Sequence, residues 1–300
     1  MGEIAVVTNQ RAGLTAKNTV AHLRNIAGGA GYVRELEPGF SNLDSIASEI
    51  HDRKAEIVAI DGGDGTIHSV LTKLAEVYGG QSLPCITPLR GGTANALADE
   101  IGIKGKPYSI LKRLVKAYKK NSIEYAERTA LKVSSNGAAD YGFIFATGMA
   151  ANFYEKYYYG SGGKYEKIAR LFWDVLLAPA RFQKELLGNG KWALKCDKIE
   201  KDCTLVLAGT IKTLGFNYAP LERAGKHDVF HMIASDASAH RLLGLSLQAR
   251  FGIKYGLDDI VLDEAVLNAE NPSSYVIDGE LKQGRELRLS LGPKLRIAKP

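Results

Sequence analysis

Two glycine-rich turns, each between an apolar strand and a helix, most constrain how this chain folds. The first, at residues 61–66, reads DGGDGT and follows an apolar run at residues 56–60. The second, at residues 88–95, reads PLRGGTAN and follows a run at residues 83–88. Strands that alternate with helices form a parallel sheet, and ligands bind in the crevice at the carboxyl ends of such strands. The sequence therefore predicts an α/β unit with a ligand site at one edge of its sheet.

The rest of the first 120 residues fits the same unit. An apolar strand is predicted at residues 4–7, and helical spacing of apolar residues predicts helices over residues 15–28, from about 67, over 94–101 and over 108–120. The last of these helices has an outward face with Lys112, Arg113, Lys116, Lys119 and Lys120. Such a face is more often a solvated surface than a phosphate site.

After about residue 124 the pattern changes to short β-rich runs. They cover residues 129–134, 141–147, 192–196, 204–208, 229–234, 260–267, 275–277 and 287–291. Many short strands separated by Gly and Asn turns predict an antiparallel sandwich. Two helices are expected within it, near residues 165–187 and 239–251, and the junction between the two parts is expected at residues 122–127.

The first turn has the composition of a binding site for charged groups. It leaves backbone N–H groups unpaired at a helix N-terminus, where they and the helix dipole attract an anion, and its glycines allow close approach. Because Asp64 would repel a bare phosphate, its presence indicates contact with a divalent cation or with a hydroxyl that loses its proton. The alternative is a plain strand-to-helix turn, but three glycines and two carboxylates within five residues favour a functional role.

The second turn has weaker signals. Thr93 can cap the following helix and Asn95 can hydrogen-bond a base or a phosphate, although each alone reads as helix capping. The chain has no GxxxxGK[ST] run and no GxGxxG run, so neither a P-loop nor a dinucleotide fingerprint explains the turns.

Composition excludes several classes. With 45% hydrophobic and 24% charged residues the chain is globular, and its cysteines, Cys85, Cys196 and Cys203, have no metal-ligand spacing. We expect reduced thiols in a cytosolic protein, with no signal peptide and no membrane-spanning segment. A net charge of +6 fits an anionic membrane, nucleic acid or a phosphorylated ligand, and a mixed solvated surface fits equally well.

The motifs together resemble the diacylglycerol kinase catalytic domain family, which includes sphingosine and ceramide kinases. The resemblance rests first on GGDGT at residues 62–66, Pro88, and GTANALA at residues 92–98, whose NALA part resembles the sphingosine kinase side. It continues in order along nearly the whole chain, with NQRAG at residues 9–13, APL at 219–221, IDGE at 277–280 and PKLRI at 293–297.

The resemblance implies two lobes. An α/β lobe with a largely parallel sheet would comprise residues 1–124 and 293–300, and an antiparallel β-sandwich lobe would comprise residues 125–292 and hold the acceptor. The last strand would return to the first lobe. The implied activity is an ATP-dependent lipid kinase that transfers the γ-phosphate to a primary hydroxyl, with ATP and Mg²⁺ in the cleft.

The same resemblance implies roles for individual residues. Asp64 would lie at the metal, and Asp64 and Glu280 are both candidates for the base that takes the hydroxyl proton. The nucleotide-binding residues would be Asn9, Arg11, Gly62, Gly63, Gly65, Thr66, Gly92, Thr93, Asn95, Lys164, Arg170, Asp278 and Gly279. Ordinary helix-surface charge explains Lys164 and Arg170 equally well.

The chain departs from the family pattern in four places. Gln10 replaces a Pro, and two glycines stand at residues 91–92 where one is usual. Residues 224–228 read AGKHD in place of a loop ending in DDG that holds a structural cation in some bacterial members, so that cation site is doubtful here. Residues 148–152 lack the acidic group that would orient the acceptor, a role that Glu155 could take.

The acceptor side is expected to meet a membrane. Residues 171–187 could form an apolar gate helix with basic flanks, which suits transient association with a membrane surface, and a helix packed on the sandwich is the alternative. Diacylglycerol, a sphingoid base and ceramide all remain candidate lipid substrates. We expect a cytoplasmic protein, peripheral to the inner face of the membrane, with no nucleic-acid partner; a homodimer stays open.

Two other functions are compatible with parts of the sequence. NAD kinase shares a GGDG turn and a two-lobed plan, but it would need an Asn-Glu dipeptide that this chain lacks. A non-catalytic lipid- or nucleotide-binding member of the family would explain the altered residues 224–228, and the retained Asp64, Asn95 and Glu280 argue against it.

Overall fold

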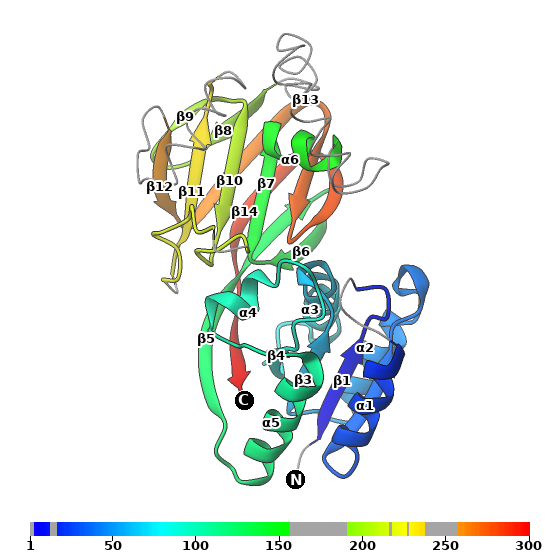
Figure 1. Cartoon of the computed structure of the whole chain (residues 1–300). Helices are drawn as coiled ribbons and strands as arrows, with labels where there is room; N and C mark the ends of the chain where they lie inside the picture. The colour runs from blue at the N-terminus through cyan, green and yellow to red at the C-terminus, as the bar shows by residue number, and fades with distance from the viewer. Residues whose placement is uncertain (1–2, 13–16, 157–190, 216–217, 227, 238–256) are drawn as a thin grey trace, which may run out of the picture.

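The protein folds into two lobes, an α/β lobe and a β lobe, with the chain crossing between them (Figure 1). The structure is a computed structural model, and it describes residues 3–12, 17–156, 191–215, 218–226, 228–237 and 257–300. In the described part no helix is long and apolar enough to cross a membrane.

The α/β lobe is a parallel sheet with helices on both faces. Its elements are β1 (Ile4–Thr8), α1 (Lys17–Ala27), β2 (Gly31–Glu35), the 3₁₀ turn η1 (Pro38–Phe40), α2 (Leu43–Asp52), β3 (Ile57–Asp61), α3 (Asp64–Tyr78), β4 (Cys85–Pro88), α4 (Ala96–Glu100) and α5 (Pro107–Lys119). The strand order is β2-β1-β3-β4, and all three pairs are parallel. Every residue of β1 and β3 is buried, which is why these two strands read as continuous apolar runs.

Two elements of this lobe were not predicted. The strand β2 is only half-buried and lies at the edge of the sheet, so its sequence, GYVRE, lacks a long apolar run. The helix α2 buries residues at helical spacing, Leu43, Ile46, Ala47 and Ile50, so the sequence does carry a periodic signal for it.

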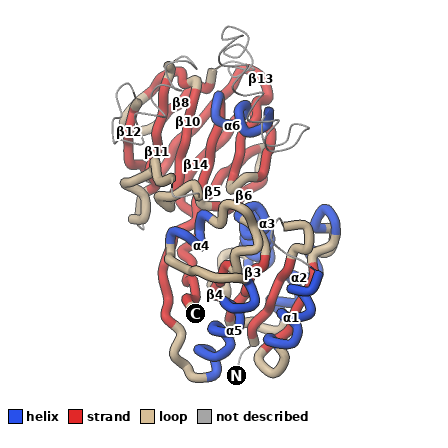
Figure 2. The backbone as a smooth tube through the Cα atoms, in the orientation of Figure 1, coloured by secondary structure: helices blue, strands red, loops and turns tan. Residues whose placement is uncertain are grey.

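The β lobe is built almost entirely from antiparallel pairs. Its elements are β5 (Glu124–Ser135), β6 (Ala138–Gly142), β7 (Ile144–Gly148), α6 (Met149–Tyr154), β8 (Trp192–Lys195), β9 (Glu200–Cys203), β10 (Leu205–Gly209), β11 (Phe230–Ser235), β12 (Asp258–Leu262), β13 (Glu264–Ile277) and β14 (Glu280–Lys299). The order β12-β11-β10-β7-β13 forms one layer, and β9-β8-β13-β14-β5-β6 forms the other. Figure 2 shows these two layers of strands above the helix-rich lobe.

The strand β13 belongs to both layers. Its register shifts between Asn268 and Ser273, so its first part pairs with β8 and its last part pairs with β7. The core between the layers contains Phe145, Trp192, Phe230, Leu267 and Leu289, all buried. The predicted sandwich is therefore confirmed.

Two predicted strands are each divided in the structure. The run at residues 141–147 is divided at Phe143, whose N–H donates to the Asp278 carboxylate, and the run at 260–267 is divided at Asp263. The strand β9 and the short helix α6 were not predicted. The helices expected near residues 165–187 and 239–251 lie outside the described residues.

The long strands β5 and β14 join the lobes. In the β lobe β14 pairs with β13, and near its end Ile297 pairs in parallel with Ile86 of β4. There the Thr87 hydroxyl donates to the carbonyl of Ala298 at 3.1 Å. The strand β5 pairs with β14 along both lobes. The predicted return of the last strand is confirmed, whereas the predicted boundary positions stay a prediction because both strands run through them.

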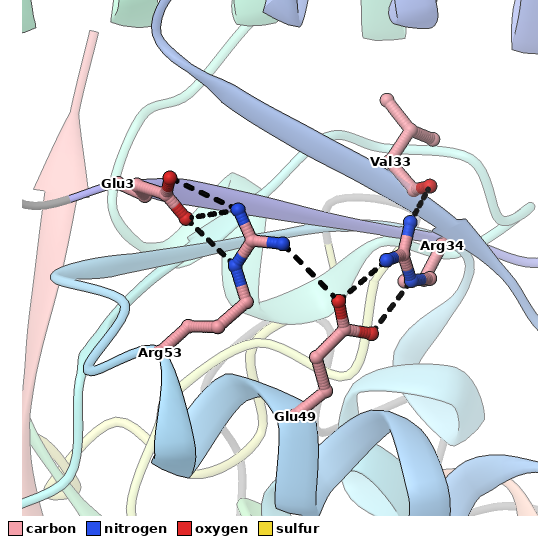
Figure 3. Close-up of polar contacts among 5 residues, drawn as sticks. All are labelled: Glu3, Val33, Arg34, Glu49 and Arg53. Atoms are coloured by element: carbon pink, nitrogen blue, oxygen red, sulfur yellow. Dashed lines mark hydrogen bonds and ion pairs between the residues drawn. The ribbon is translucent and has the colours of Figure 1, made fainter.

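An ion-pair network ties α2 to β2 and to the residue before β1 (Figure 3). Arg34 binds Glu49 through two contacts of 2.6 and 2.5 Å, and Arg53 reaches Glu3 at 2.9 Å through Nε. Both guanidinium groups lie over the ring of Tyr32, at 5.0 and 4.0 Å from its centroid. Because β2 is an edge strand, this network secures the edge of the parallel sheet that lies away from β4.

Candidate active site

A cavity of about 680 Å³ lies between the lobes and takes residues from both. The α/β lobe contributes Asn9, Arg11, Ala12, Gly63, Asp64, Gly65, Thr66, Gly92, Thr93, Ala94 and Ala96. The β lobe contributes the turn at residues 278–280, part of α6 and one face of its sheet. The two glycine-rich turns therefore do open into one crevice, as their place after neighbouring strands predicts.

The two turns touch each other backbone to backbone. A Cβ atom added to Gly92 would lie 2.2 Å from Cα of Gly63, so only glycine allows this approach. The backbone of Asn95 is left-handed (φ 55°), and its side-chain amide bonds the backbone of Gly92 in both directions, accepting from N at 3.1 Å and donating to O at 2.7 Å. Asn95 thus shapes the turn and does not line the cavity.

Asp64 joins the first turn to the second. It begins α3, and its carboxylate accepts the N–H of Leu97, in the first turn of α4, at 3.4 Å. Thr93 is exposed and α4 has no side-chain cap of its own, so the expectation that Thr93 caps this helix is wrong. Burial raises the pKa of the Asp64 carboxyl, and backbone N–H groups at the start of α4 oppose that rise.

The loop after β1 closes the same end of the cavity. The Asn9 side chain donates to the hydroxyl of Thr66 at 2.9 Å, and its carbonyl oxygen accepts the N–H of Arg11 at 3.0 Å. These bonds fix three predicted nucleotide-binding residues beside the N-terminus of α3. The Arg11 side chain is exposed and lines the cavity, where it can reach a bound anion.

The β lobe supplies its acids from one tight hairpin. Asp278 and Gly279 connect β13 to β14 with φ values of 46° and 87°, a two-residue turn in which both residues are left-handed. The buried Asp278 carboxylate accepts the N–H groups of Phe143, at 3.0 Å, and Ile144, at 2.9 Å. Glu280 reaches across to α3: a Cβ atom on Gly65 would lie 2.2 Å from its Oε1.

The carboxyls at the cavity are poorly solvated. Burial, and then the nearby charge of Asp64, raise the pKa of Asp278 well above its ordinary value. Burial also raises the pKa of Glu280, and the Lys282 ammonium opposes that rise. Because burial and mutual repulsion disfavour the ionised form of these acids, a positive charge bound among them would stabilise it.

A short helix missed by the sequence analysis supports the hairpin. The Tyr154 hydroxyl, at the end of α6, donates to the carbonyl of Gly279 at 2.8 Å and lines the cavity. Glu155, expected to replace a missing acidic group, accepts the Ser274 hydroxyl at 2.7 Å and does not line the cavity. An isolated tyrosine six residues after a strand carries no motif, so only the fold reveals Tyr154.

The other half of the cavity is apolar. Ile233, Leu207, Ala146 and Val276 lie directly opposite one another on β11, β10, β7 and β13, and all four line the cavity. Their neighbours along the strands, such as Phe145, point to the sandwich core instead. Ala150 and Phe153 of α6, which lies over these strands in Figure 1, add to the same wall. A row of apolar side chains thus extends from the acidic hairpin.

The lobes also meet behind the acids. His68 of α3 is buried, and its Nδ1 lies 2.9 Å from the carbonyl of Tyr141 in β6. Its Nε2 lies 3.7 Å from Asp140, which also binds Lys282. Burial, and then the Lys282 ammonium, lower the pKa of His68 to about 4, so the imidazole is neutral and Nδ1 donates.

Residues 3–124 match the family model for the diacylglycerol kinase catalytic domain. This segment is therefore similar to the diacylglycerol kinase catalytic domain. The matched segment covers the α/β lobe with both glycine turns and Asp64. No protein with a curated description matches the chain.

Solved structures of the same shape extend the comparison to the second lobe. A crystal structure of a diacylglycerol kinase from Bacillus anthracis strain Sterne aligns over 99% of this chain and 97% of its own, with a TM-score of 0.68 and 12% identity. Two other structures from that strain, provisionally named diacylglycerol kinases, align over 96% of this chain and 93% of their own, with TM-scores of 0.69 and 14% identity. At these identities the likeness establishes the fold.

Most residues singled out by the family resemblance come together at the cavity. Asp64, Glu280, Asn9, Arg11, Gly63, Gly65, Thr66, Gly92, Thr93, Asp278 and Gly279 line it. Gly62 lies behind Thr66 and does not line it, and neither does Asn95. Lys164 and Arg170 lie outside the described residues. Their roles with nucleotide stay predictions of the family resemblance.

Proposed function

We propose that this protein is an ATP-dependent kinase that transfers the γ-phosphate to a primary hydroxyl of a lipid. The observation that carries the proposal is the composition of the cavity between the lobes. Glycine turns at a helix N-terminus, the four carboxyls of Asp64, Glu222, Asp278 and Glu280, and an apolar sheet face line it together. The glycine turns suit phosphates, the carboxyls suit a cation and a hydroxyl, and the apolar sheet face suits an alkyl chain.

The α/β lobe would bind the nucleotide. Backbone N–H groups at Gly63 and the start of α3 would face the phosphates, while Thr66, Thr93 and the guanidinium of Arg11 would add donors. The glycine contact between the turns keeps side chains from filling this space.

The carboxyls fit a Mg²⁺ ion that arrives with the nucleotide. Across the described residues no three acidic, His or Cys side chains are arranged to hold a metal without help. Mg²⁺ usually binds one or two carboxylates together with substrate phosphates, and Asp64 beside the glycine turn meets that requirement. Bound there, the ion would neutralise charge on the phosphates.

The transfer step needs a base at the acceptor hydroxyl. The hydroxyl oxygen would form a bond to the γ-phosphorus, the bond from that phosphorus to the bridging oxygen of ADP would break, and a carboxylate would take the proton. Asp64 and Glu280 both line the cavity and are both candidates. Their raised pKa values suit a base that works near neutral pH.

The acceptor would lie along the β lobe. The apolar row on β11, β10, β7 and β13 would hold an alkyl chain, with the primary hydroxyl at the hairpin of residues 278–280. Diacylglycerol, ceramide and a sphingoid base all have this form. Because such lipids reside in a bilayer, we also propose transient association with a membrane surface.

The test is label transfer from γ-labelled ATP with Mg²⁺ to diacylglycerol, ceramide and sphingosine, each in neutral detergent micelles. NAD is included as an acceptor because NAD kinase shares part of this plan. Label in one lipid supports the proposal and names the acceptor. Label in NAD alone, or ATP binding without transfer to any lipid, contradicts it.

A further inference from the structure

The net positive charge of the chain is concentrated in one segment. Residues 101–123 contain Lys104, Lys106, Lys112, Arg113, Lys116, Lys119 and Lys120 and no acidic residue; we name these seven the basic strip. Without them the chain has 32 basic and 33 acidic residues, so the rest of the molecule has a formal charge of −1. The basic strip therefore accounts for the whole excess of positive charge.

The fold exposes every charged side chain of this segment. All seven side chains are exposed, on α5, in the loop before it and, for Lys120, just after it, while Ile110, Leu111, Leu114 and Val115 bury the other face of α5. In the part of the chain that the structure describes, the basic strip makes no ion pair with a carboxylate; Arg113 bonds only the Ser109 hydroxyl and the Lys104 carbonyl. Seven cations without acidic partners repel one another, which favours binding of an anionic surface.

We propose that the basic strip is the surface through which this kinase docks on an anionic phospholipid bilayer. The proposal rests on the proposed function, because a lipid acceptor places the bilayer next to the enzyme. The apolar face of α5 is packed against its own lobe, so α5 cannot insert into the bilayer. Contact is therefore electrostatic, with lipid headgroups, and reversible by salt.

Nucleic acid is the competing anionic partner, and the surface fits it less well. Single strands are held by aromatic side chains that stack on bases as well as by cations. In the segment of the basic strip only Tyr108 is a well-exposed aromatic residue, at 41%. A bilayer needs only a broad distribution of positive charge.

The experiment measures binding to phosphatidylglycerol–phosphatidylcholine vesicles by sedimentation, without ATP. The variant Lys112→Gln/Lys116→Gln/Lys119→Gln removes three exposed charges without a side-chain partner, so we expect it to fold. Near an anionic membrane each basic residue contributes roughly fivefold in affinity, so we expect at least about tenfold weaker binding. Binding of the wild type should also fall steeply between 50 and 300 mM salt.

Two control variants distinguish the effect of where the charges lie from the effect of how many charges are removed. The variant Lys54→Gln/Lys195→Gln/Lys294→Gln removes the same charge from exposed residues elsewhere and should keep most of the binding. The variant Lys112→Arg/Lys116→Arg/Lys119→Arg keeps the charge and should bind as the wild type does.

The outcomes distinguish docking from catalysis. In neutral detergent micelles the Gln variant should phosphorylate lipid at the wild-type rate, while its rate on anionic vesicles falls. Vesicle binding that is equal in both triple-Gln variants overturns the docking proposal, whatever the kinase activity. Unchanged vesicle binding with loss of RNA binding overturns it and assigns the basic strip to nucleic acid. Docking without label transfer in micelles contradicts the proposed function instead.

Discussion

At the scale of single residues, the site consists of groups held by backbone atoms. Asp64 accepts an N–H of α4, and Asp278 accepts N–H groups of Phe143 and Ile144. The sequence motifs predicted which carboxyls reach the cavity, because glycine turns and the DGE hairpin have strict local geometry. They did not predict that Asp64 caps α4 or that Tyr154 supports the hairpin, because each contact joins segments that are far apart in the sequence and meet only within the folded lobe.

The first residue to test is Asp64. We expect Asp64→Asn to fold, since the amide oxygen can still accept the Leu97 N–H. It should lose turnover by roughly a thousandfold, because it would lose charge at the proposed Mg²⁺ and basicity at the proposed acceptor hydroxyl. Circular dichroism and label transfer measure the two effects. Glu280→Gln is the matched variant, and turnover near the wild-type value in either would remove that residue as the base.

Because the pKa of Asp278 is raised in the folded protein, we expect the free energy of unfolding to depend on pH. The folded protein keeps a proton on Asp278 to higher pH than the unfolded chain does, so this group lowers the free energy of unfolding as pH rises above about 4. Asp278→Asn removes the titration while its oxygen can accept both N–H groups.

Urea unfolding with EDTA present, between pH 5 and 8, measures this effect. Stability of Asp278→Asn relative to the wild type should increase with pH, by at most about 1.4 kcal/mol per pH unit. A constant difference across that range would show that Asp278 is ionised in the folded protein throughout.

At the scale of elements, α3 connects the two halves of the site. Its first turn carries Asp64, and its second and third turns place His68 and Thr72 against Tyr141 of β6. Periodicity predicted the apolar face of α3 and most of the strands. It did not predict the short elements α6 and β9. It also predicted one strand over residues 141–147 where the structure has two, because the bond from the Phe143 N–H to a side chain does not alter the spacing of apolar residues.

The contact between α3 and β6 should weaken in acid. His68 stays neutral in the folded protein to about pH 4, whereas in the unfolded chain it takes up a proton near pH 6.5. The unfolded state therefore binds more protons between these values, and the free energy of unfolding falls as the pH is lowered through them.

The variant His68→Asn separates the bond from the titration. Its amide can donate to the Tyr141 carbonyl but does not titrate, so the loss of stability between pH 6.5 and 4 should be smaller than in the wild type, while His68→Ala should be less stable at every pH. Urea titrations across this range provide the measurement. Identical acid sensitivity in the wild type and His68→Asn would rule out His68 as a source.

At the scale of the whole molecule, β5 and β14 make the two lobes one cooperative unit. The short β-rich runs predicted the β-sandwich and the family resemblance implied the returning strand, but neither predicted that β14 would extend unbroken for 20 residues. Its buried Ile297 pairs with β4 and with β5 in the α/β lobe, while the same strand pairs with β13 above.

Unfolding should therefore be a single transition. Helix content, which in the described chain lies mainly in the α/β lobe, and the fluorescence of Trp192, buried in the β lobe, should give coincident curves. Ile297→Ala should shift both by the same amount, with a loss of about 2–4 kcal/mol. A shift in helix content alone would mean that the lobes unfold independently.

The pairing of β4 with β14 also sets an order of events during synthesis. Thr87 and Ala298 are 211 residues apart, and at ribosomal rates that separation is roughly 10 to 40 s. Throughout this interval the nascent α/β lobe has an unpaired strand edge, a surface that promotes aggregation. The cavity, too, has only one wall until the hairpin at residues 278–280 emerges. Neither the complete sheet nor the complete cavity can form on the ribosome before the β lobe has been made. The edge of β4 must therefore be protected from aggregation until β14 pairs with it.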